Sequence, residues 1–110
     1  MPPQHQNLDP QIWQQLTLSQ QLANVGSEVI RSLNWQKKDN HNYSQLAFYP
    51  SLELLSLSIN DPKNLTSLKE LTRTYEILVD YFTNQNSYQT QAQDLEKYFL
   101  AFNYSARKNT

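Results

Sequence analysis

The chain has 110 residues, a formal net charge of -1 and only 17% charged residues. This length holds one domain with a single hydrophobic core. The low charge argues against a broad electrostatic surface for nucleic acid or an anionic membrane. Aromatic residues make up 12% of the chain, which favours an ordered fold over disorder. There is no cysteine, which excludes disulfides and thiol chemistry and predicts a cytoplasmic location.

The N-terminal residues 1–10 contain Pro2, Pro3 and Pro10 and show no helical periodicity. We therefore expect a flexible lead-in over residues 1–10 and a single helical domain over residues 11–107. The lead-in lacks the charged and apolar regions of a signal peptide. No later apolar run approaches the roughly 20 residues that span a membrane, so no membrane partner is expected. A short turn after the lead-in is expected to pack Trp13 over one end of the core.

The first long helix is predicted to begin at Thr17 and to end near Lys37 or Lys38. Thr17 and Gln20 have the spacing of a capping box, in which each side chain accepts a hydrogen bond from a free backbone N–H group. Gly26 is the only glycine in the chain and lies at the edge of the apolar face. We expect a close helix crossing there, with a backbone site for a ligand as the alternative. The apolar face consists of Leu18, Leu22, Val25, Val29 and Leu33.

The second helix is predicted to begin between residues 40 and 42 and to end near Ile59. Pro50 lies in the middle of this segment. A proline inside a helix removes one backbone hydrogen bond and clashes with the preceding turn, at a cost of about 3 kcal/mol. We therefore expect the second helix to be kinked or broken near Pro50. Its inward face is predicted to include Leu46, Ala47, Leu54, Leu55 and Ile59.

The third helix is predicted over 65–82, capped by Asn64 or Ser67, and the fourth over 91–106. A polar tract between them, residues 83–90, is predicted to be a loop. Four helices of this length joined by short loops predict an all-α fold, an antiparallel four-helix bundle. The inward stripe of the third helix has steps of three and four residues; it consists of Leu65, Leu68, Leu71, Tyr75, Leu78 and Phe82.

Four segments in this order resemble a family of small helical bacterial proteins, abundant in cyanobacteria, for which no activity is established. The resemblance covers about residues 16–107, and at Pro50 the chain departs from the helix-compatible residue expected for the family. It implies a fold but no cofactor, partner or reaction. The segments are QQLANVGSEVIRSLNW (20–35), SLELLSLSINDPKN (51–64), LKELTRTYEILVDYF (68–82) and YFLAFNYSAR (98–107).

A looser similarity in size and helix number links the chain to the HEPN-type and 23S ribosomal-RNA intervening-sequence four-helix proteins. HEPN ribonucleases carry an arginine and a histidine separated by four to six residues. The two histidines here are His5 and His41, and the arginine nearest before His41 is Arg31, ten residues away. The nuclease motif is therefore absent. RNA binding, or a degenerate HEPN-type nuclease-like protein, is the alternative that this similarity leaves open.

Charged residues gather on the polar side of the third helix. Arg73 is three residues from both Glu70 and Glu76, so one guanidinium can bridge two carboxylates. Glu76 and Asp80, four apart, are the best candidates for a metal pair, but without a helical histidine or a second pair they predict a solvated or salt-bridged face. Glu28 and Arg31 on the first helix are expected to join this polar network or partner site.

No catalytic residue, metal site or cofactor is predicted, so an enzymatic role is disfavoured. The leading hypothesis is a non-enzymatic protein-interaction module that associates with itself, because the helices carry more aromatic residues than one core stripe needs. RNA binding draws support from basic residues beside aromatic ones at two helix ends, at 35–38 and 104–108. The surplus aromatic residues are Trp13, Trp35, Tyr43, Tyr49, Tyr81 and Tyr104.

Overall fold

The computed structural model describes residues 8–83 and 86–108, and the predicted lead-in lies outside this range for residues 1–7. The described residues contain helices and no strand, which confirms the all-α prediction. The elements in order are α1 (Pro10–Trp13), α2 (Leu18–Lys37), α3 (His41–Ile59), a 3₁₀ helix η1 (Pro62–Ser67), α4 (Leu68–Thr83) and α5 (Ala92–Lys108).

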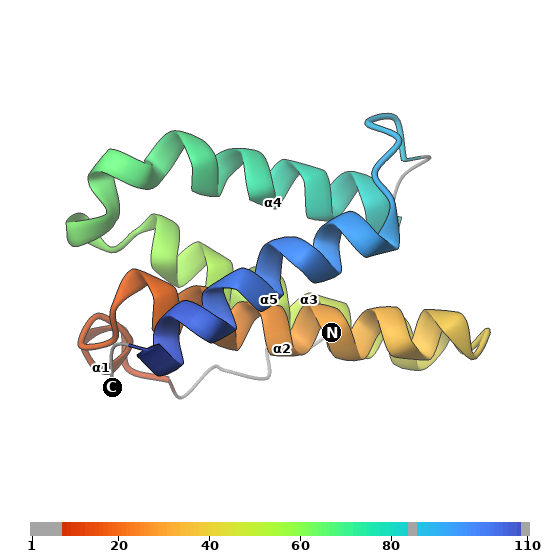
Figure 1. The fold of residues 1–110 in the computed structure, drawn as a ribbon, viewed down its shortest axis with the longest axis horizontal. Helices are drawn as coiled ribbons and strands as arrows, with labels where there is room; N and C mark the ends of the chain where they lie inside the picture. The colour runs from red at the N-terminus through yellow and green to blue at the C-terminus, as the bar shows by residue number, and fades with distance from the viewer. Residues whose placement is uncertain (1–7, 84–85, 109–110) are drawn as a thin grey trace.

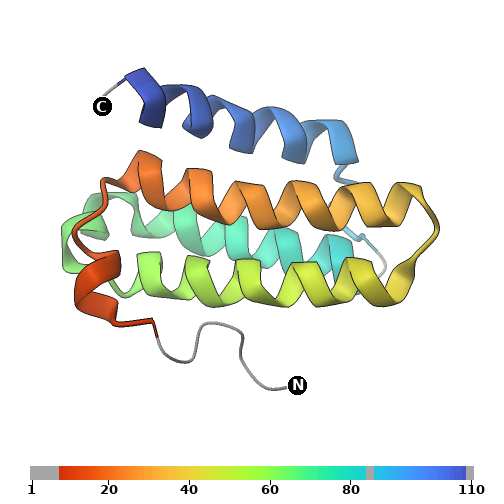
Figure 2. The ribbon, with the colours of Figure 1, turned by 90° about the horizontal axis from the view of Figure 1, so that it is seen from below.

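The helices α2 and α3 form the central pair of the fold. They are joined by a short turn and run in opposite directions side by side (Figure 2). The helix α5 packs on α2, whereas α4 packs on α3, so the two outer helices lie on different members of the central pair (Figure 1). Side chains connect α4 and α5: the Tyr98 hydroxyl lies 3.2 Å from the Thr74 hydroxyl and donates to Glu70 at 2.9 Å.

Small polar residues bring α2 and α3 close together. The Ser32 hydroxyl donates to the Ser44 carbonyl at 2.7 Å, and the Ser44 hydroxyl lies 3.0 Å from the Ser32 carbonyl. Both serines are buried, so each satisfies a polar group of the other helix inside the core. Because Ser32 and Ser44 face each other, they define which residues of the two antiparallel helices lie at the same level.

Gly26 marks the crossing of α2 and α5, as predicted. A Cβ atom placed on Gly26 would lie 2.6 Å from the Phe99 Cβ, a distance that carbon atoms do not tolerate. Phe99 is itself fully buried, so it cannot swing aside. The capping box at Thr17 and Gln20 is also confirmed, with both reciprocal hydrogen bonds present.

Pro50 does not break α3, so the prediction of a helix broken near Pro50 was wrong. The helix is continuous from His41 to Ile59 with Pro50 inside it and fully buried. The proline has no N–H group to donate to the Leu46 carbonyl. The neighbouring Ser51 hydroxyl donates to the Phe48 carbonyl at 2.5 Å, which satisfies another acceptor in the same turn. Burial of the ring and of its neighbours in the core opposes the cost of the missing hydrogen bond.

The start of the third long helix also differs from the prediction. Asp61, rather than Asn64 or Ser67, caps the segment, and the first six residues form η1 instead of an α-helix. A 3₁₀ helix has three residues per turn, so the apolar stripe loses its phase there. Leu65 is 72% exposed and Leu68 is 37% exposed, whereas Leu71 and Leu78 are fully buried. The predicted stripe is therefore wrong at its first two positions.

A buried polar network joins α1, α2, α3 and η1 at one end of the molecule, and its centre is Gln21. The Gln21 side-chain amide donates to the Trp13 carbonyl at 3.0 Å and to the Asp61 carboxylate at 2.9 Å. Its carbonyl accepts from the Asn64 amide at 2.9 Å. The Trp13 indole donates to the Ser58 hydroxyl at 3.1 Å, which confirms that Trp13 packs over one end of the core.

Asp61 is the charged member of this network. Lys63 forms a salt bridge with the Asp61 carboxylate and also donates to the Gln14 carbonyl at 3.0 Å. Burial raises the pKa of Asp61, but hydrogen bonds from Lys63 and Gln21 outweigh burial, so the pKa lies below its usual 3.8. The ionised carboxylate is therefore the form that the folded state prefers.

Replacing Gly26 with alanine should destabilise the fold. The helix propensity of alanine favours the variant by about 1 kcal/mol, but the clash with Phe99 costs about 1–3 kcal/mol and should outweigh it. Urea unfolding monitored by circular dichroism measures the difference. The control is Ser27→Ala on the exposed side of the same helix, which should change the free energy of unfolding little. Equal stability of Gly26→Ala and wild type would contradict the close crossing.

The Asp61→Asn substitution should cost about 1–3 kcal/mol at neutral pH, because Lys63 and Gln21 lose a charged acceptor. The folded-state pKa is lowered, so this contribution is present above pH 3.8 and is lost as the pH falls through the folded-state value. Unfolding experiments at pH 7 and pH 3 should therefore show a difference from wild type that shrinks in acid. A difference independent of pH would show that the charge is not the cause.

Candidate functional site

The outward surface of α3 is unusually apolar for a side exposed to solvent. Tyr43, Leu46 and Tyr49 follow one another at intervals of three residues and are 50%, 44% and 42% exposed. Glu53 is the single charged residue of this 19-residue helix when histidine is neutral. The prediction that Leu46 faces inward was wrong. We call this surface, with its flank on α2, the α2–α3 face; it consists of Glu28, Arg31, Trp35, Tyr43, Leu46 and Tyr49.

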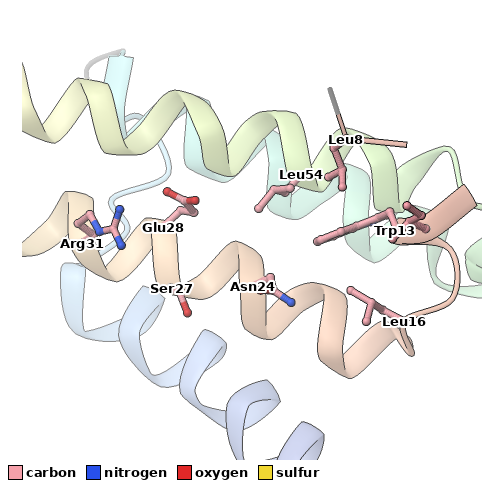
Figure 3. Close-up of a pocket in the computed structure, with 9 residues that line it drawn as sticks. Leu8, Trp13, Leu16, Asn24, Ser27, Glu28, Arg31 and Leu54 are labelled. Carbon is pink, nitrogen blue, oxygen red and sulfur yellow. The ribbon is translucent and has the colours of Figure 1, made fainter. Parts of the chain in front are cut away.

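Two shallow pockets form a groove beside this helix. One has a volume of about 350 Å³ and the other about 240 Å³, and Glu28 and Arg31 line both. Figure 3 shows the first pocket, with Trp13 toward one end, Glu28 and Arg31 toward the other, and Leu54 between them. Trp35, Tyr43 and Leu46 line the second pocket. The groove is therefore apolar along α3 and charged on the α2 side.

The aromatic residues of the α2–α3 face hold one another in place. The rings of Trp35 and Tyr43 meet edge to face with centroids 4.8 Å apart. The Lys38 ammonium lies over the Trp35 ring, 5.0 Å from its centroid. Such contacts restrict the side chains before any partner arrives, which lowers the entropic cost of binding.

A third shallow pocket, of about 550 Å³, lies between α3 and α4. It is lined by Tyr49, Leu52, Glu53, Ser56 and Tyr75. The exposed ridge of α3 therefore has a groove on each side. A ridge between two grooves suits packing against helices of another molecule, since helices pack with ridges of side chains in grooves.

The predicted charged site on α4 is not formed among the described residues. Arg73 is exposed, and its guanidinium lies over the Tyr88 ring, 5.3 Å from the centroid, instead of bridging Glu70 and Glu76. The Glu70 carboxylate accepts the Tyr98 hydroxyl at 2.9 Å. Glu76 is exposed on the outer side of α4. The ladder of ion pairs was therefore a wrong prediction.

Asp80 has a structural role at the end of α4. It is buried, and its two carboxylate oxygens accept the backbone N–H groups of Ser87 at 2.9 Å and Tyr88 at 3.0 Å. These bonds hold the segment that leads to α5. Across the described part of the chain, no group of three or more acidic or histidine side chains has the arrangement of a metal site.

Glu28 and Arg31 do not join the α4 residues. They lie on α2 and line the groove beside α3, whereas Arg73 lies beside Tyr88 after the end of α4. The six predicted site residues therefore do not form one site. Only Glu28 and Arg31 belong to the α2–α3 face.

The two basic and aromatic patches are also apart. Ser105 of α5 lies 3.1 Å from Ser19 at the start of α2, so residues 104–107 are near the beginning of α2. Residues 35–38 are at its other end, about 25 Å away at 1.5 Å per residue. Lys37 is paired with Glu96 at 2.8 Å. The residues proposed for RNA therefore do not form one surface.

Tyr98 provides a test of the contact between α4 and α5. Burial, assisted by Glu70, raises the pKa of Tyr98 to about 12. Because the folded-state pKa is raised, the stabilisation is complete below pH 10 and is lost as the pH rises toward 12. Tyr98→Phe should lose about 1 kcal/mol at pH 8 and should show a weaker loss of stability between pH 10 and 12 than wild type. Equal alkaline unfolding of both proteins would contradict this assignment.

None of the helices in the described residues is long and apolar enough to cross a membrane. No protein-family model, curated protein or solved structure matches the chain. The case for a function therefore depends on the geometry and chemistry of the α2–α3 face.

Proposed function

We propose that this chain is a non-enzymatic interaction module, an antiparallel four-helix bundle that associates with itself through the α2–α3 face. The observation that carries the proposal is the exposed run Tyr43, Leu46 and Tyr49 on a helix with a single charged residue. Depletion of charge and enrichment in tyrosine and tryptophan are the compositional marks of the centre of an interface. The edge of an interface is polar, and at the two sides of this apolar run lie the charged residues Arg31, Glu28 and Glu53.

The size and charge of the molecule suit such a contact. A stable interface buries about 800 Å² on each partner, which is a modest part of the 7086 Å² surface of this chain. The net charge of -1 produces little repulsion between copies. The cytoplasm is the compartment we propose, because a chain without cysteine needs no oxidising environment.

RNA binding remains the rival function from another class. It would need cations along a continuous surface, and the two basic and aromatic patches, at residues 35–38 and 104–107, lie near opposite ends of α2. A titration with single-stranded and structured RNA at low salt tests it. Binding that weakens with salt and persists in a strictly monomeric protein would favour RNA over self-association.

The Leu46→Glu variant tests self-association directly. A glutamate there would have to be buried in the interface without a partner, so the dissociation constant should rise at least about 100-fold, as for a residue at the centre of an interface. Sedimentation velocity over a range of concentrations gives the dissociation constants of variant and wild type.

The matched control is Leu100→Glu, since Leu100 is 51% exposed on α5 and lies outside the α2–α3 face. Leu100→Glu should associate as wild type does. A wild-type protein that stays monomeric at millimolar concentration would overturn the proposed function. Equal effects of both substitutions would place the contact elsewhere.

A further inference from the structure

We propose that a second site, separate from the α2–α3 face, lies between α4 and α5 and binds a small organic cation, an ammonium ion with apolar groups on its nitrogen. The site is a pocket of about 330 Å³ formed by α4, α5 and the segment that joins them. This volume lies within the range of small-molecule sites in proteins. The inference goes beyond self-association and does not depend on it.

The pocket is bounded by contacts between distant parts of the chain. The helices α4 and α5 lie closest near the segment that joins them and diverge toward their other ends (Figure 1, Figure 2). Near the joining segment the pocket is lined by residues 88–90. Further along the two helices, the Tyr98 hydroxyl of α5 lies 3.2 Å from the hydroxyl of Thr74, which is buried on α4. The pocket therefore has a wall on each helix and a boundary at each end.

The segment beside the pocket is held by hydrogen bonds that a ligand does not have to form. The buried Asp80 at the end of α4 accepts the backbone N–H groups of Ser87 and Tyr88. The Asn86 side chain donates to the Thr90 carbonyl at 2.8 Å and accepts the Thr90 N–H group at 2.9 Å. The backbone of Tyr88 is thus fixed before a ligand arrives, which lowers the entropic cost of binding.

The chemistry of the lining favours a cation with apolar substituents. The face of a tyrosine ring attracts a cation, and two tyrosines line the pocket. Asp94, in the first turn of α5, adds a carboxylate at the edge. In the described part of the chain, no lysine or arginine lines this pocket. The apolar wall consists of Ile77, Leu95, Tyr88 and Tyr98.

The ring of Tyr88 already attracts one cation, from outside the pocket. The Arg73 guanidinium lies over this ring, 5.3 Å from its centroid, and is not part of the pocket lining. Its charge opposes a second cation, but Arg73 is exposed to water and salt, which screen it. The carboxylates of Asp94 and Glu70 act in the opposite direction, and that of Glu70 accepts the Tyr98 hydroxyl at 2.9 Å.

Three probes of the same shape and different charge test the class of ligand. Choline carries a trimethylammonium group, 3,3-dimethyl-1-butanol is its neutral isostere, and 3,3-dimethylbutanoate is an anion with the same branched end. Titrations of the nitrogen-15-labelled protein, followed by NMR at constant ionic strength, give the dissociation constants and the position of each probe. Choline should bind about fivefold more tightly than the alcohol, and the anion should bind most weakly. The shifted amides should include those of Ile77, Tyr88, Thr90 and Leu95.

The Asp94→Asn variant tests the carboxylate. It removes the charge but keeps an oxygen that can accept the Gln91 N–H group, as Asp94 does at 3.2 Å. The dissociation constant of choline should rise about threefold, and that of the neutral alcohol should not change. The matched control is Asp39→Asn, the same charge change at an exposed position outside the pocket, which should leave both constants unchanged.

The Tyr88→Ala variant tests the aromatic ring. It keeps the backbone N–H group that donates to Asp80, so the segment should remain in place. The dissociation constant of choline should rise about threefold or more, whereas Tyr88→Phe, which retains the ring, should bind as wild type does. Tyr104→Ala on α5 is the matched control, since Tyr104 is 72% exposed and lies outside the pocket. Thermal unfolding of each variant confirms that the fold is intact.

The results that would overturn the inference are specific. Equal affinity for choline and the neutral alcohol, or tighter binding of the anion, would show that the ligand is not a cation. Absence of saturable shifts at the pocket, or a choline affinity that neither Asp94→Asn nor Tyr88→Ala changes, would show that the site is not there. A strictly monomeric protein that binds choline as described would support this inference while the proposed self-association fails.

Discussion

The side-chain amide of Gln21 is the point at which one end of this fold is held together. It is fully buried and bonds to a backbone carbonyl of α1, to Asp61 before η1 and to Asn64 within η1. Burial of the Gln21 amide without these hydrogen bonds would cost several kcal/mol of folding free energy. The segments that carry its partners therefore have to meet α2 in this one arrangement. Trp13 and Asn64 in turn donate to Ser58 of α3, so the network also connects α3 to α2 at this end.

The hydrogen-bond network around Gln21 also explains why some residues that helical periodicity predicts to be buried are exposed. Asp61 and Asn64 are drawn inward to Gln21, and the segment that contains them adopts a 3₁₀ helix. Leu65 is then turned toward solvent. At the other end, the Ser32 and Ser44 contact brings α2 and α3 together through small side chains. Tyr43 and Leu46 lie on the outward side of α3 and are exposed, whereas Phe48 of the same helix is fully buried.

The features that could be predicted from the sequence are those that depend on local periodicity or on the properties of a single residue. The capping box at Thr17, the close crossing at Gly26 and the burial of Trp13 follow from spacing and residue type. The break at Pro50 was wrong because burial in the core opposes the local cost of a proline. The ion-pair ladder at Arg73 was wrong because Tyr98 and Tyr88, distant in sequence, provide other partners for Glu70 and Arg73. Partners that are distant in the sequence leave no periodic signal in it. The rotation of α3 about its axis, which exposes Leu46, leaves none either.

Asp61, Lys63 and Asp80 stabilise the segments at the helix ends, and the exposed apolar surface of α3 is the feature that self-association would explain. Small-angle X-ray scattering over a concentration series tests this explanation most directly. The isolated chain has a mass of 12.9 kDa and a radius of gyration of 13.6 Å. Self-association through the α2–α3 face predicts that the scattering mass doubles with concentration, that the radius of gyration rises, and that Leu46→Glu prevents both changes. A mass that stays at 12.9 kDa throughout would contradict it.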